Sequence, residues 1–180
     1  MPKKKWAVSI CTVDGQRFSI GDVHDKFTIQ STSKPIIYAL TLNELGTEVV
    51  HKYQGREPSG RMFNEIALDH NMQPHNPMVN SGALMSASIL LSLVRPDLHM
   101  AQKFAYLSDF IKKMAGDEYL GFNNSVFLSE RETADGIFAL AYFLRENGCF
   151  PTSSSDIEIL DVIDFYLQVS LLLHMLDMEM

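Results

Sequence analysis

A stretch without any charged residue, residues 78–94, most constrains how this chain can fold. Leucines alternate there with small residues such as Gly82 and Ala87, so that a helix formed by the stretch presents no charged face. A helix that is apolar all round is either buried in the protein or spans a membrane. The serines in the stretch, together with Asn80, favour a central buried helix against which other helices pack closely.

The remaining helical signals predict partners for this central helix. Apolar residues recur at helical spacing in four further segments, at residues 31–45, 101–115, 130–147 and 157–176. Gly46 follows the first of them as a helix-ending residue, and Asp156 precedes the last as an N-cap. The charge-free part of the last helix, residues 165–176, is too short to cross a bilayer. Residues 47–77 lose all periodicity, and a loop of that length is usually functional or carries short turns.

The amino-terminal part of the chain predicts a β-hairpin. Two runs of alternating apolar residues, 6–12 and 16–20, flank Asp14-Gly15, which is a strong hairpin signal. A two-stranded hairpin is marginal in water by itself, and nothing after Gly21 predicts a further strand. We therefore expect an α+β fold in which the hairpin belongs to a larger sheet, and a chain that is part of something longer.

Charge and composition exclude several classes of partner. A net charge of −7 argues against nucleic acid, since binding phosphates needs a basic surface. The two cysteines, Cys11 and Cys149, form no CxxC motif, and no histidine pair has zinc spacing. We expect reduced, buried thiols, no metal and no cofactor. No signal peptide and no transit segment rich in arginine and serine precedes Trp6.

Ser31 and Lys34 are the first candidates for chemistry. Residues three apart share a face of a helix, so the lysine can lie beside the serine hydroxyl. A serine alcohol needs a base to become nucleophilic, and a lysine in a partly dry pocket can lose its proton and act as that base. Ser-x-x-Lys at a helix start is typical of β-lactamase-type acyl-transfer enzymes. The pattern alone favours an ordinary capped helix that carries a surface lysine, and the surrounding sequence is needed to support catalysis.

Several blocks of sequence resemble the glutaminase family, the serine enzymes that hydrolyse L-glutamine to L-glutamate and ammonia. The blocks are Val-Ser-Ile-Cys-Thr-Val-Asp-Gly-Gln-Arg at 8–17, Gln-Ser at 30–31 with Lys-Pro at 34–35, Leu-Gly-Thr-Glu at 45–48, Gly-Arg-Glu-Pro-Ser-Gly at 55–60, Pro-His-Asn-Pro-Met-Val-Asn-Ser-Gly-Ala at 74–83, Lys-Met-Ala-Gly at 113–116, Ser-Glu-Arg-Glu at 129–132 and Asp-Phe-Tyr at 164–166. These blocks keep the family's order from about residue 6 to residue 168, and their sequences resemble those of the animal enzymes most.

The resemblance implies roles for five residues. Ser31 matches the nucleophile and Lys34 its activating base, while Asn80, Glu130 and Tyr166 match residues that hold the substrate. An acid suits the α-ammonium of glutamine, and neutral donors suit its carboxylate or side-chain amide. Without the resemblance, Glu130 would be an acid in a first helical turn, Asn80 a hydrogen-bonding residue at a helix start, and Tyr166 a core aromatic.

The chain also departs from the family pattern. The family carries an Arg-Asn pair whose asparagine contacts substrate, whereas this chain has Gly136 and Ile137. Ile137 lies about two helical turns after Glu130, on the same face, and offers no donor to a carboxylate. The family's upstream tyrosine, and the later part with a second tyrosine and the rest of the oxyanion hole, have no counterpart here. We therefore expect little turnover from this chain alone.

These observations together predict one partial domain over residues 1–180, an incomplete β-lactamase/transpeptidase-like domain that is mainly helical with a remnant antiparallel hairpin. The function that the resemblance implies is glutaminase. One alternative is a catalytically impaired module that associates with other subunits, and a weaker one is a serine enzyme that recognises β-lactams. The expected partners are L-glutamine and either a second copy or a full-length glutaminase. The resemblance implies a mitochondrial location; without a transit peptide, the cytoplasm is the alternative.

Overall fold

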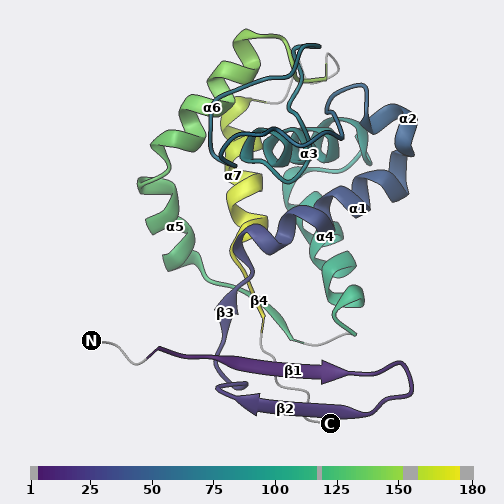
Figure 1. Ribbon diagram of the computed structural model, residues 1–180, viewed down its shortest axis with the longest axis vertical. Helices are drawn as coiled ribbons and strands as arrows, with labels where there is room; N and C mark the ends of the chain where they lie inside the picture. Colours follow the sequence, from purple (N-terminus) through teal and green to yellow (C-terminus); the bar gives the residue numbers. More distant parts are fainter. Residues whose placement is uncertain (1–3, 117–118, 152–157, 175–180) are drawn as a thin grey trace.

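The computed structural model describes residues 4–116, 119–151 and 158–174, and its helices pack around α3 (Asn80–Leu93) (Figure 1). Every residue of α3 from Ser81 to Ser92 is buried. It packs against α1 (Ser33–Leu45), α6 (Asp135–Glu146) and α7 (Ile159–Ser170), and α7 also contacts α4 (Met100–Met114). The prediction of a central buried helix is confirmed.

The chain around α1 follows the predicted boundaries closely. A short 3-10 helix, η1 (Gln30–Thr32), leads directly into α1, and Gly46 ends α1 with φ 75°. This positive φ suits glycine, which lacks the Cβ that hinders other residues there. One helical turn, α2 (Thr47–Val50), follows, and the chain up to α3 is otherwise without helix or strand, as expected.

Two small antiparallel sheets lie below the helices (Figure 1). The predicted hairpin is confirmed as β1 (Ala7–Cys11) and β2 (Arg17–Gly21), which pair only with each other in the described part of the chain. A second sheet, in the order β3-β5-β4, contains β3 (Phe27–Thr28), β4 (Leu120–Phe122) and β5 (Leu172–His174).

The second sheet corrects two predictions. The expectation that no strand follows Gly21 is wrong, since β3, β4 and β5 all follow it. The sequence does not reveal them because strands of two or three residues are too short to show alternation. The last helix was predicted to run to residue 176, but α7 ends at Ser170 and the chain then forms β5. A continuous apolar run such as 171–173 fits a buried strand and a buried helix equally well by periodicity. The predicted N-cap Asp156 lies outside the described residues.

The predicted helix 130–147 is in fact two helices. The first, α5 (Asn124–Glu132), begins where the Asn123 side chain accepts hydrogen bonds from two backbone N–H groups of the first turn. It ends before Thr133, and α6 starts at Asp135. Glu130 therefore lies near the end of α5, and its interpretation as an acid in a first helical turn is wrong. The apolar periodicity of the sequence runs through the break and hides it.

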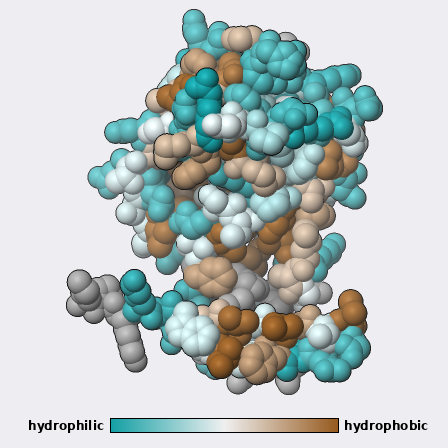
Figure 2. Space-filling view, viewed as in Figure 1, coloured by the Kyte–Doolittle hydropathy of each residue, from teal (hydrophilic) through white to brown (hydrophobic). Residues whose placement is uncertain are grey.

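The hairpin is exposed along nearly its whole length. Val8 pairs with Ile20 and Ile10 with Phe18, so these four side chains share one face, and each is 44–57% exposed. Figure 2 shows apolar side chains gathered on the hairpin, below the more polar surface of the helical body. The expectation of buried thiols fails for the same reason, since Cys11 ends β1 and is exposed; Cys149 is half-buried, and both thiols are free.

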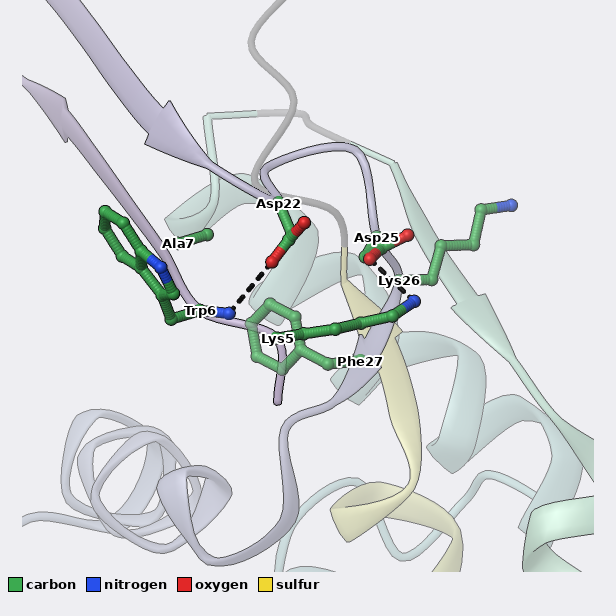
Figure 3. A pocket seen from close by; sticks show the side chains of 7 residues that line it. All are labelled: Lys5, Trp6, Ala7, Asp22, Asp25, Lys26 and Phe27. Atoms are coloured by element: carbon green, nitrogen blue, oxygen red, sulfur yellow. Dashed lines mark hydrogen bonds and ion pairs between the residues drawn. The ribbon is translucent and has the colours of Figure 1, made fainter. Parts of the chain in front are cut away.

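Polar contacts join the residues before β1 to the residues between β2 and β3. The Trp6 backbone N–H donates to Asp22 (3.0 Å), and Lys5 forms an ion pair with Asp25 (2.7 Å), around a hollow of about 280 Å³ that Phe27 also lines (Figure 3). The acids of this hollow are engaged by groups of the hairpin itself, so we interpret it as the attachment point of the hairpin.

Candidate functional site

Ser31 lies in η1, at the junction between the second sheet and α1. Its side chain is exposed, and the preceding Gln30 has φ 48°, a left-handed conformation that costs energy for any residue with a Cβ. The Ile29 N–H donates to the Leu172 carbonyl oxygen in β5 (3.0 Å), and α7 packs against η1. The backbone of this serine is therefore held between β5, α7 and α1.

Lys34 follows one turn later, in the first turn of α1, and is only 4% exposed. Its Nζ donates to Oδ1 of Asn80 (2.7 Å) and lies 5.4 Å from the centre of the Phe63 ring. Burial lowers the pKa of Lys34, because the charged ammonium is poorly solvated there. A lysine in this state releases its proton more readily than a surface lysine and can act as a base.

Asn80 links Lys34 to a cavity of about 310 Å³. The lining residues come from the loop before α3, from α3, from both sides of the break between α5 and α6, and from α7: Phe63, Asn64, Asn80, Glu130, Thr133, Ala134, Gly136, Ile137, Leu140 and Leu167. Two of the five predicted site residues, Asn80 and Glu130, thus face the same space. Lys34 reaches it through Asn80, and Ser31 is not among its lining residues.

Tyr166 lies on α7, one residue before Leu167 of the cavity wall, and is 7% exposed. Burial, and secondly the nearby Glu130 carboxylate, raise the pKa of Tyr166 to about 12. The phenol is therefore protonated at neutral pH. It can donate a hydrogen bond there, and the effect of Glu130 on its pKa ties Tyr166 to the acid of the cavity.

Ile137 and Glu130 line the same cavity, but the reason differs from the predicted one. The prediction put both residues on one face of a continuous helix, whereas α5 and α6 each supply one of them. The Arg131 Nε donates to Asp164 of α7 (2.6 Å), and its guanidinium lies 5.6 Å from the Phe138 ring centre. Arg131 thus contacts the next two helices that wall the cavity.

Sequence reasoning missed three polar or aromatic members of the cavity wall, Phe63, Asn64 and Thr133. Phe63 and Asn64 belong to the long non-periodic segment, whose length was the one signal for them. The Phe63 carbonyl oxygen accepts from the Asn80 N–H (2.8 Å), which fixes this loop at the start of α3. Within residues 4–116, 119–151 and 158–174, no cluster of three or more potential ligands could hold a metal ion.

No helix in the described part of the chain is both long and apolar enough to cross a membrane.

The model of the Glutaminase family matches residues 1–178. The chain is 52% identical over 164 residues to "Putative glutaminase 2" of Caenorhabditis elegans, and 43% identical over 164 residues to the mitochondrial liver isoform of glutaminase from Rattus norvegicus. Each alignment covers 91% of this chain and 26% of the relative.

A bacterial relative and a solved structure are also glutaminases by name. Glutaminase 2 of Clostridium perfringens is 38% identical over 158 residues, which are 86% of this chain and 50% of that protein. The crystal structure of a probable glutaminase from Bacillus subtilis superposes with a TM-score of 0.81 at 30% identity, and covers 94% of this chain and 52% of that one. The chain thus spans about a quarter of its animal relatives and half of its bacterial ones. From sequence and fold alike, the chain belongs to the glutaminase family.

Proposed function

We propose that this site hydrolyses the side-chain amide of L-glutamine through an acyl-enzyme on Ser31. The observation that supports this most is the buried Lys34, a potential base three residues after the exposed Ser31. Its pKa is lowered by burial, and it contacts Asn80 of the cavity wall. Neutral Lys34 takes the Ser31 hydroxyl proton as Oγ bonds to the amide carbon. The proton leaves with the departing nitrogen as ammonia, and water then cleaves the ester to give glutamate and free Ser31.

The cavity supplies groups for the rest of the substrate. Glu130 is a carboxylate suited to the α-ammonium of glutamine, and Asn80 offers an amide N–H₂ because its Oδ1 is already engaged by Lys34. Tyr166, protonated at neutral pH, can donate to an oxygen of the substrate. The space of about 310 Å³ fits a small, single ligand.

Covalent labelling tests this assignment. A diazoketone analogue of glutamine should form one adduct on the chain, located by mass spectrometry at Ser31. Ser31→Ala should abolish the adduct, and Lys34→Ala should slow its formation by about 100-fold or more, because the alcohol loses its base. Ser125→Ala, an exposed serine on α5, serves as the matched control. Labelling that survives Ser31→Ala would remove this serine from the proposed role.

We further propose that the protein associates with a second copy or with a longer glutaminase chain, and that it works in mitochondria. The exposed apolar face of the hairpin supports the first, since such faces recruit partners. The mitochondrial liver isoforms of rat and mouse, 43% identical to this chain, support the second. Light scattering of the purified chain tests association, and imaging of the full chain fused to a fluorescent protein tests the compartment.

A further inference from the structure

The cavity between α3, α5, α6 and α7 has an uneven distribution of charge. Glu130 is the one formally charged side chain among its ten lining residues, all of which belong to the described chain. Asn64, Asn80 and Thr133 are neutral and polar. The remaining wall is apolar or bare backbone, and it consists of Phe63, Ala134, Gly136, Ile137, Leu140 and Leu167.

Lys34 and Arg131 are basic side chains next to residues of the cavity wall, and each has a partner of its own. Lys34 donates to Asn80 and is nearly inaccessible, so it faces the cavity only through that amide. The Arg131 guanidinium is paired with Asp164 (2.6 Å) and lies over the Phe138 ring. A carboxylate that enters the cavity would therefore face Glu130 without a free cation on the wall to compensate its charge.

This distribution of charge favours the ammonium group of an amino acid over its α-carboxylate. An ammonium group gains from Glu130, whereas an α-carboxylate loses its hydration and meets a like charge and an apolar wall. Ile137 is half-buried and presents only carbon atoms to the cavity, on the opposite side of the α5–α6 break from Glu130. A neutral amide in place of the carboxylate avoids the repulsion and can bond to Asn64, Asn80 or Thr133.

From this we infer that the cavity prefers glutamine whose α-carboxyl group is an amide, as in glutamine α-amide or the amino-terminal glutamine of a peptide, to free glutamine, and that Ile137 determines this preference. The inference rests on the proposed function of the same cavity and specifies its substrate class. The reaction is unchanged: the side-chain amide carbon is transferred to Ser31 and ammonia leaves.

Calorimetric titration of the full chain with L-glutamine and with L-glutamine α-amide tests the inference. Both ligands are compared at about pH 6, below the pKa of ~7.7 of an α-amino group, so that both carry the ammonium. We expect the dissociation constant of the α-amide to be about 10-fold lower or more. Ile137→Asn, which adds an N–H₂ donor, should bring the two ligands within about 3-fold. Ile137→Val keeps an apolar wall and should retain the preference, and the circular dichroism of both variants checks their folding.

Three results would overturn the inference. Free glutamine could bind as tightly as its α-amide, or Ile137→Asn could leave the ratio unchanged; the proposed glutaminase function would survive either result. Absence of binding by both ligands would also refute the preference. In that case the Ser31 adduct with the diazoketone decides separately whether the proposed function stands.

Discussion

Replacing Lys34 by methionine should stabilise the fold while slowing acylation of Ser31 by about 100-fold or more. Burial lowers the pKa of Lys34 below the ordinary value of 10.5, so the folded chain holds this proton less tightly than the unfolded chain. Between the lowered pKa and 10.5 the unfolded state binds more protons, and the free energy of unfolding therefore rises with pH. Below the lowered pKa the wild type bears the full cost of the buried charge, so the advantage of methionine is largest there.

The expected change in the free energy of unfolding follows from the cost of burying the ammonium and from the contacts that it makes. Burying an ammonium costs several kcal/mol, and the bond to Asn80 returns about 1.5–3 kcal/mol and the Phe63 ring about 0.5–1 kcal/mol. Methionine fills similar space and carries no charge. Asn80 lines the cavity, so water can reach the oxygen that the ammonium leaves. We expect a net gain of about 1 kcal/mol at pH 7, or about 2–4 °C in Tm for a chain of this size.

Urea unfolding followed by circular dichroism, repeated between pH 6 and about pH 10.5, measures this directly. The advantage of Lys34→Met over the wild type should shrink steadily as the pH approaches the upper value. Lys52→Met, at an exposed lysine, is the control and should show no such trend. A methionine variant that is less stable than the wild type at pH 7, by an amount independent of pH, would refute the argument that the buried charge is costly.

Three further outcomes are expected. Glu130→Gln should lower the pKa of Tyr166 from about 12, because a negative charge near the phenol is lost; an unchanged absorbance titration, referenced to Tyr166→Phe, would contradict this. Gly82→Ala should destabilise the chain by about 2 kcal/mol or more in urea unfolding, since the new Cβ would lie 1.9 Å from the Asn76 carbonyl oxygen. Ile10→Lys should reduce association in light scattering, and equal oligomer content would argue against the hairpin face as the contact.

The sequence was most informative where a long pattern had one physical solution. The charge-free stretch at 78–94 could only be a buried helix or a membrane span, and α3 is buried as predicted. Asp14-Gly15 between alternating runs predicted the hairpin, and β1 and β2 pair on either side of it. Strands of two or three residues have no pattern to detect, because their existence depends on hydrogen bonds between segments far apart, such as those of β5 with β3 and β4.

The sequence suggested residues for the candidate site, but it did not predict their geometry. The resemblance singled out Lys34 and Asn80, yet their contact joins the starts of two helices 46 residues apart and follows from packing alone. The division of the cavity wall at Thr133 was hidden, because an apolar stripe that continues through a break looks the same as an unbroken helix. The burial that shifts the pKa of Lys34 likewise depends on the surrounding helices.

Because of the break between α5 and α6, two separate helices carry the two parts of the cavity wall. Glu130 lies on α5, which the Asn123 cap begins and which the Arg131–Asp164 ion pair connects to α7. Ile137 lies on α6, which is held in place by its own buried leucines. A mutation on one helix therefore need not tilt the other. The acid and the wall around Ile137 can thus be altered separately, and a small combinatorial library at Thr133, Gly136 and Ile137 can redesign the wall while Glu130 stays in place.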